Sequence, residues 1–208
     1  MPEASLVPLF LQSLLIGFSI AAPVGPIGLL TIQRTLQQGP RVGLATGLGA
    51  AAADAVYGAV GAFGVTALID ALTAARVPLV LGGGVFLLWL AWSIWRAPVA
   101  ERAAQAPGGA DLLRSFAGTF VLTLSNPATI LSFIAVFGAL AGRLTVSSPW
   151  TMISGVLLGS ALWWLLLSAV VGRLRERFDA RWRRRVNLAS ACVLAGFAVW
   201  QGLGLLSR

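Results

Sequence analysis

The sequence predicts an all-α integral membrane protein with six transmembrane helices. We expect two inverted-topology three-helix repeats in which the first and fourth helices are broken. Three observations lead to this prediction. The 208 residues are 58% hydrophobic and 11% charged, with a mean hydropathy of +0.87, which is unusual for a soluble domain. Several apolar runs reach the length of about 20 residues that crosses a bilayer, and prolines interrupt two of them.

The first apolar run covers about 6–36 and contains Pro23 and Pro26. As one straight helix it would measure about 46 Å, whereas a hydrocarbon core is about 30 Å thick. Because proline lacks an N–H and clashes with the carbonyl four residues earlier, these prolines would release the carbonyls of Ser19 and Ala22. A bilayer tolerates such groups only where protein or a water-filled cavity receives them. We therefore expect a broken helix whose break lines a path for a solute.

Five further spans follow the first. The second is rich in glycine and alanine, which lets helices approach closely in a membrane. The third is followed by a stretch with prolines and glycines that indicates a cytoplasmic linker. The expected spans are 42–69, 77–95, 115–140, 150–171 and 186–206. This predicts one membrane domain with a first repeat at 1–96, a linker at 97–114 and a second repeat at 115–208.

The arginines are distributed unequally between the two sides of the membrane. The first, third and fifth connections hold Arg34, Arg41, Arg96, Arg102, Arg114 and seven arginines between 173 and 185, whereas the opposite side holds Arg76, Arg143 and Arg208. The positive-inside rule places the arginine-rich connections in the cytoplasm and both termini outside. Topology thus explains the net charge of +8, and no nucleic-acid partner is expected. The segment Arg173–Arg185 is also predicted to contact anionic lipid.

Asp54 is the one acidic residue that falls inside a predicted span. Counting from Arg41 at about 1.5 Å per residue places it about 20 Å into the membrane. A carboxylate at that depth costs at least about 2.5–3.5 kcal/mol, so it should face a cavity or a partner. Protonation would lower the cost, which suits Asp54 to proton coupling or to balancing a cationic substrate group. The alternative is a structural carboxyl bonded to a neighbouring helix, with the Tyr57 hydroxyl one turn later to help satisfy it.

Pro26 and Pro127 lie at comparable depths in the first and fourth spans, which favours one binding site between the repeats. Beyond each break, the free N–H groups of a new helical segment attract an anionic group, while released carbonyls attract a cation. With Asp54, this predicts a site for a zwitterion. Gly25 precedes the first break, and Asn126 adds a donor and an acceptor to the second. The alternative is that both prolines only kink their helices.

The ordered set Pro23-Val24-Gly25-Pro26, Gly47-x-Gly49, Asp54 and Asn126-Pro127 resembles the LysE/RhtB family of amino-acid exporters. The resemblance covers the whole chain. It implies a secondary exporter of amino acids or related metabolites in the bacterial inner membrane, driven by the proton-motive force. Many relatives have a basic residue after Asn-Pro, whereas this chain has Ala128, so the resemblance identifies no particular substrate.

The sequence therefore predicts a proton-coupled transporter that works by alternating access, rather than an enzyme. The alternative is a non-transporting membrane scaffold or assembly subunit. No cofactor or metal is expected, since the chain has one cysteine and no histidine. Expected partners are an amino acid or derivative, protons, membrane lipids and a second copy bound through the small-residue faces. The predicted substrate- and proton-binding residues are Asp54, Pro23, Gly25, Pro26, Asn126, Pro127, Gly49 and Tyr57.

Overall fold

The structure is a computed structural model, and all regular structure in its described residues is helical. The described residues are 3–23, 25–63, 76–96, 108–126, 129–133, 136, 148–175 and 180–206. The helices are α1 (Glu3–Ala21), α2 (Pro26–Gln38), α3 (Pro40–Phe63), α5 (Arg76–Arg96), α6 (Gly109–Leu124), α8 (Pro149–Leu174) and α9 (Ala180–Leu206). A further helical turn covers 129–133. The prediction of an all-α protein is confirmed for these ranges.

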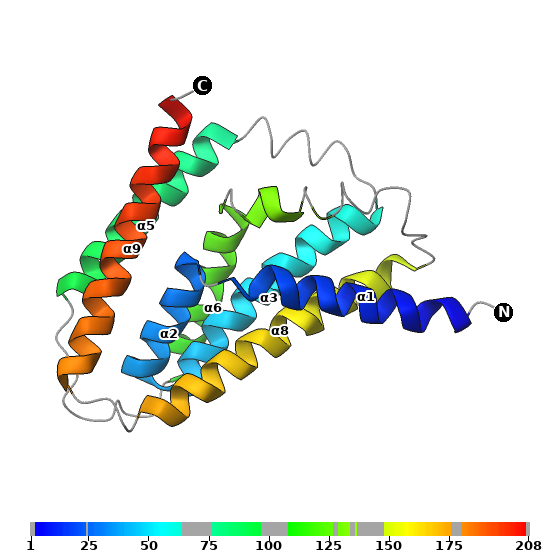
Figure 1. The fold of residues 1–208 in the computed structure, drawn as a ribbon, viewed down its shortest axis with the longest axis horizontal. Helices are drawn as coiled ribbons and strands as arrows, with labels where there is room; N and C mark the ends of the chain where they lie inside the picture. Colours follow the sequence, from blue (N-terminus) through cyan, green and yellow to red (C-terminus); the bar gives the residue numbers. More distant parts are fainter. Residues whose placement is uncertain are drawn as a thin grey trace.

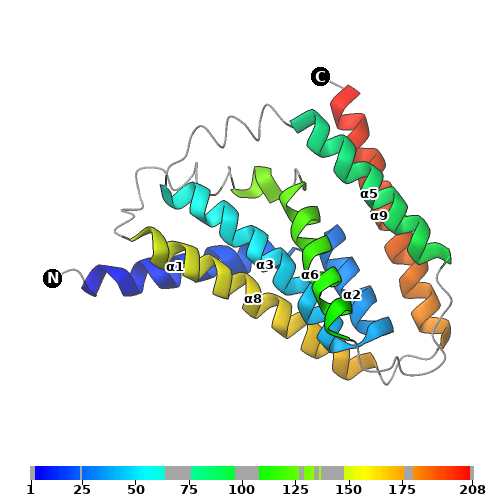
Figure 2. The same ribbon diagram turned by 180° about the vertical axis from the view of Figure 1, so that it is seen from behind.

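The helices form two groups, which Figures 1 and 2 show from opposite sides. Helices α5 and α9 pack as a pair at one end of the molecule, while α1, α3, α6 and α8 make up the rest of the body. Helix α2 contacts α3, α8 and α9, so it joins the two groups. The start of α2 therefore lies in the interior, where several elements meet.

The predicted break in the first span is confirmed. Helix α1 ends at Ala21 and α2 begins at Pro26, and their axes differ by 77°. Proline is favoured at the first position of a helix because its missing N–H would have no helical partner there. Between the helices, the Gly25 N–H donates to the Pro23 carbonyl over 2.9 Å.

The fourth span is also interrupted where the sequence predicts. Helix α6 ends at Leu124, and the Asn126 N–H donates to the Thr123 carbonyl at 3.1 Å. The Asn126 carbonyl accepts from the Ile130 N–H at 3.1 Å, which starts the turn at 129–133. Pro127, which prompted this prediction, lies outside the described residues.

A single residue, Gly39, joins α2 to α3. Its φ of +100° falls in a region that favours glycine, because a Cβ there would be strained. Arg175 satisfies the last carbonyls of α2, since Nε donates to the Leu36 carbonyl at 3.0 Å and Nη2 to the Gln37 carbonyl at 3.3 Å. The prediction that Arg34 belongs to this connection is wrong, because Arg34 lies inside α2.

Glycines allow close contact between helix backbones, as expected for membrane helices. A Cβ at Gly159 of α8 would clash with the Leu14 carbonyl of α1, and one at Gly49 of α3 would clash with the Phe116 carbonyl of α6. Gly47 of α3 packs in the same way on Trp164. These small-residue faces are thus covered within one chain, so a homodimer would need another surface.

Not every predicted span is a long apolar helix in the described residues. Among the helices described, α8 is the one whose length and composition suffice to cross a membrane, and the bent pair formed by 6–21 and 26–38 is a second candidate. Helix α3 carries Arg41 and Asp54, and α9 begins with several arginines, which makes both less apolar. The count of six spans stays a prediction.

The tight contact at Gly49 leads to a stability prediction. Gly49→Ala should lower the free energy of unfolding by about 1–3 kcal/mol, because the new methyl group overpacks the interface between α3 and α6. The measurement is the thermal unfolding midpoint of detergent-purified protein. Gly118→Ala on α6 is the matched control, since no heavy atom lies within 4 Å of a Cβ built there. Equal midpoints for the two variants would contradict this account of the interface.

Candidate functional site

A cavity of about 200 Å³ lies between the two helix breaks. Pro23, Gly25 and Pro26 line it from the first break. Thr123 and Asn126 line it from the end of α6 at the second break. The structure therefore brings together, around one space, two segments that lie about 100 residues apart in the sequence.

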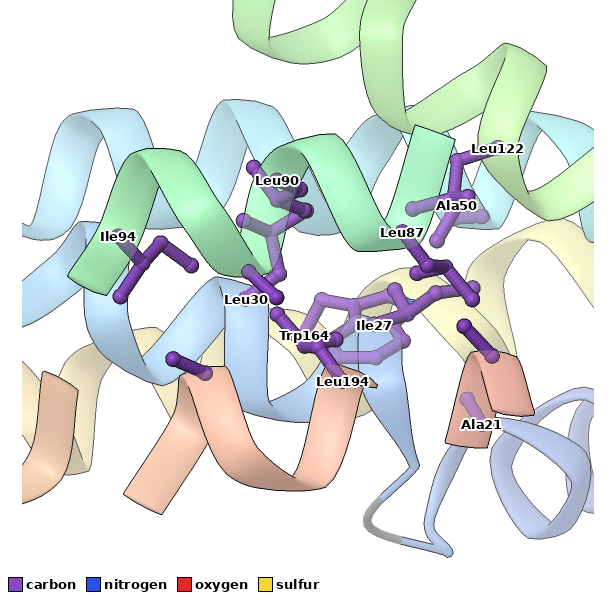
Figure 3. Packing of buried hydrophobic residues seen from close by; sticks show 14 residues of the cluster. Ala21, Ile27, Leu30, Ala50, Leu87, Leu90, Ile94, Leu122, Trp164 and Leu194 are labelled. Carbon is purple, nitrogen blue, oxygen red and sulfur yellow. The ribbon is translucent and has the colours of Figure 1, made fainter. Parts of the chain in front are cut away.

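One side of the cavity is apolar. Trp164 of α8 and Phe197 of α9 line it, together with Ile27 of α2. Figure 3 shows Trp164 beside Ile27, Leu30 and Leu194, in a buried cluster that also includes residues of α5. This packing fixes the position of the indole ring. The neighbouring Trp163 instead makes an edge-to-face contact with Phe18 of α1, with the ring centres 5.4 Å apart.

Asp54 faces this cavity from α3 and is 3% exposed. Ser160 Oγ on α8 donates a hydrogen bond to Asp54 Oδ2 over 2.7 Å. Trp164 Nε1 in turn donates to Ser160 Oγ over 3.1 Å. A chain of hydrogen bonds therefore runs from the indole through the hydroxyl to the carboxyl group, and it joins α8 to α3.

Ser160 is not among the site residues predicted from the sequence. A usable signal was present, because Ser160 and Trp164 are four residues apart and so share one face of a helix in the middle of the fifth predicted span. What the sequence lacked was the rotation of that helix, which decides whether its polar face meets Asp54 or another neighbour.

The first turn of α2 supplies hydrogen-bond donors to the cavity. Ile27 and Gly28 line the cavity, and their N–H groups precede the first intrahelical bond, which the Leu29 N–H donates to the Gly25 carbonyl at 3.0 Å. Among the residues that the structure describes, no side chain caps this end of α2. The N-terminal end of a helix also carries a partial positive charge, which favours an anionic group.

Two predicted site residues lie outside the cavity lining. Tyr57 does not bond Asp54. Its hydroxyl donates to the Leu124 carbonyl at 2.7 Å, and its ring stacks on Phe133 with the ring centres 5.2 Å apart. Gly49 packs on the backbone of α6 instead. Both residues therefore position the second break relative to α3, one through a hydrogen bond and the other through close packing.

The family model described as LysE type translocator matches residues 18–202, which is most of the chain. The chain belongs to this family. The resemblance stated from the motif residues is thus confirmed.

Several relatives match over most of their length. The chain is 32% identical over 176 residues to the uncharacterized membrane protein YahN of Escherichia coli K12, covering 81% of this chain and 78% of YahN. It is 29% identical over 201 residues to the chemotactic transduction protein ChpE of Pseudomonas aeruginosa, covering 93% of this chain and 97% of ChpE. It is 26% identical over 214 residues to the arginine exporter protein ArgO of Serratia proteamaculans, covering 96% of this chain and 100% of ArgO. No solved structure matches the chain significantly.

The hydrogen bonds at Asp54 lead to a second prediction for this LysE-family protein. Ser160→Ala should cost about 1–3 kcal/mol of stability, because it leaves the buried carboxyl group and the Trp164 indole without the partner they share. The measurement is again the thermal unfolding midpoint.

Ser154→Ala is the matched control, since the Ser154 hydroxyl only bonds the Thr151 carbonyl within α8, at 3.0 Å. A double-mutant cycle with Asp54→Asn should show coupling between positions 54 and 160. Additive effects in that cycle would contradict a direct interaction.

Proposed function

We propose that this LysE-family protein is a secondary transporter that exports amino acids or related small zwitterionic or cationic metabolites across the bacterial inner membrane. One observation carries the proposal, namely that Asp54 and the uncapped start of α2 face the same cavity. A relative named arginine exporter, ArgO, matches over 96% of this chain and supports an amino acid as the cargo.

The cavity suits the charges of an amino acid. Asp54 attracts the ammonium group, and the N–H groups at the start of α2 attract the carboxylate. Its volume of about 200 Å³ lies below the range of about 300–1,000 Å³ that holds drug-sized ligands, which favours a small solute. The apolar wall at Trp164 and Ile27 leaves room for the substrate side chain to make nonpolar contacts.

Competition at one carboxyl group gives a simple mechanism for proton coupling. Among the described residues, Asp54 has no cationic partner, so a proton or a substrate ammonium group is what would neutralise it. On the cytoplasmic side, the ammonium group would displace the proton from Asp54. On the outer side, a proton would displace the ammonium group and release the substrate. Each exported molecule would then be exchanged for an entering proton.

Alternating access requires two halves that can rock against each other, and the helix contacts support such halves. In the predicted repeats, α1 corresponds to α6, α3 to α8 and α5 to α9. If the two repeats exchange places, the α1–α8 contact therefore becomes the α6–α3 contact. Under the same exchange, the α3–α8 and α5–α9 contacts map onto themselves. An inverted repeat would produce this pattern, with the cavity at its centre.

Similarity to ChpE, which is named a chemotactic transduction protein, favours one second candidate function. In that case the chain would be a non-transporting membrane subunit, and Asp54 would serve only to join α3 to α8. This alternative predicts that the reconstituted protein carries no solute flux.

Transport by the reconstituted protein tests the proposal. In proteoliposomes preloaded with unlabelled amino acids, wild-type protein should accumulate the labelled form of at least one of them by counterflow. Asp54→Asn should lower proton-driven flux by about tenfold or more, because the neutral amide can neither bind a proton nor attract an ammonium group. Its remaining flux should not respond to pH.

Asp111→Asn is the control for this experiment, since Asp111 is an exposed carboxylate in the first turn of α6. It should transport like the wild type. Normal flux with an unchanged pH response in Asp54→Asn would overturn the coupling mechanism. The absence of counterflow in wild-type protein for every amino acid would favour the subunit alternative.

Thiol labelling tests the proposed orientation, in which the arginine-rich connections are cytoplasmic. Single cysteines replace Trp150 at the start of α8 and Arg184 near the start of α9, in a Cys192→Ser background. In intact spheroplasts, a membrane-impermeant maleimide should label the cysteine at position 150. It should label the one at position 184 only after the membrane is disrupted. The reverse labelling pattern would show that the protein has the opposite orientation in the membrane.

A further inference from the structure

Arg34 is held between three helices on the predicted cytoplasmic side of the cavity. It lies on α2, and its guanidinium group is half-buried. Arg34 Nη1 donates to Thr46 Oγ1 of α3 at 3.1 Å, and to Thr119 Oγ1 and the Ser115 carbonyl of α6, each at 3.3 Å. Three oxygens thus hold one nitrogen of the group in a defined position.

All three of these acceptors are neutral. The acidic side chains that the structure describes are Asp54 and Asp111, and neither is bonded to Arg34. A partly buried cation without a counter-charge is costly, and arginine cannot lower that cost by losing its proton. The surroundings of Arg34 therefore favour an anion that comes from elsewhere.

The geometry of the guanidinium group leaves room for such an anion. All of its hydrogen bonds to the described residues use Nη1, so Nε and Nη2 remain available. These two nitrogens form the edge of arginine that binds a carboxylate through two parallel hydrogen bonds. Neither Nε nor Nη2 of Arg34 is among the described buried side-chain atoms that lack a hydrogen-bond partner, so this edge is not fully enclosed.

A polar face connects Arg34 to the cavity. Ser115, Thr119 and Thr123 are buried and recur every four residues along α6, and Thr123 lines the cavity. On α3, Thr46 beside Arg34 and Asp54 in the cavity are also on one face, eight residues or about 12 Å of helix apart. One carbon separates the ammonium group from the carboxylate at the α-carbon of an amino acid, so these two groups cannot reach Asp54 and Arg34 at the same time.

We propose that Arg34 is an entry site for the carboxylate of the exported amino acid, separate from the cavity at Asp54 and on its cytoplasmic side. The proposal rests on the function proposed above. The substrate would first bind through its carboxylate to Nε and Nη2 of Arg34. It would then move along the hydroxyl groups of α6 to the cavity, where its ammonium group meets Asp54. Arg34 would thus set the affinity for cytoplasmic substrate and leave the turnover rate nearly unchanged.

Transport kinetics of a matched pair of substrates test this role. The pair is the amino acid with the highest counterflow and its carboxamide, which keeps the ammonium group and lacks the negative charge. Arg34→Gln should raise KM for the amino acid about tenfold or more and leave KM for the carboxamide unchanged. The kcat should stay within about twofold for both substrates. Arg34→Lys should restore part of the affinity, because lysine keeps the charge but not the paired donors.

Arg41→Gln is the matched control. It removes the same charge from an exposed position at the start of α3, so KM should be unchanged. The measurements use vesicles of phosphatidylcholine alone, so that a contact between Arg34 and an anionic lipid headgroup cannot produce the effect. A KM effect that appears only when anionic lipid is added would assign Arg34 to the headgroup and overturn the proposal. Equal changes in KM for the amino acid and its carboxamide would also overturn the proposal.

Ligand-induced stabilisation separates this proposal from the proposed function. L-arginine should raise the unfolding midpoint of purified wild-type protein more than L-argininamide does, and Arg34→Gln should abolish the difference. If this result appears without any transport, the carboxylate site stands and the transport function fails. If wild-type protein shows neither transport nor a difference in midpoint, the entry site is overturned.

Two further variants keep the test decisive if Arg34→Gln does not fold. Arg34→Lys retains the charge, and Thr119→Val removes one oxygen that orients the guanidinium group. Each should raise KM for the amino acid by a few-fold and leave that for the carboxamide unchanged. Unchanged KM values in both variants, purified as monodisperse protein, would also overturn the proposal.

Discussion

The rest of the structure depends on the inability of Pro26 to continue α1. Because the chain turns by 77° before this residue, α2 starts in the interior of the molecule instead of at a surface. The first N–H groups of a helix have no partner within it, and an apolar interior makes that costly. A polar space next to the break resolves this conflict, and Asp54 and Asn126 contribute to that space.

Close packing of the helices makes the site possible. Gly47 brings α3 against Trp164, whose neighbouring turn carries Ser160, and this contact lets the Ser160 hydroxyl reach Asp54. A larger residue at position 47 would push α8 away from α3. The glycines that the sequence analysis linked to packing therefore also determine how the buried carboxyl group is satisfied. Stability and the geometry of the site share the same contacts.

Asp54 and Arg34 are opposite charges held apart. Each is bonded to neutral groups from neighbouring helices, and Asp54 lies about two helical turns along α3 from Thr46, which bonds Arg34. Had they been adjacent, they would have formed an ion pair. Instead, hydroxyl groups of neighbouring helices reduce the cost of burying each side chain, Ser160 for Asp54 and Thr46 and Thr119 for Arg34.

The sequence by itself determined the helical class, the two breaks and the requirement that Asp54 face a cavity or a partner. A missing N–H and the cost of a buried charge are properties of single residues, whatever surrounds them. Only the tertiary structure decided the partners. Asp54 bonds Ser160, 106 positions away, while Tyr57 bonds Leu124. Arg34 lies inside α2, with its side chain between helices, although the sequence predicts that it belongs to the first connection. Such contacts depend on how each helix is rotated against its neighbours, which residue spacing along the chain does not specify.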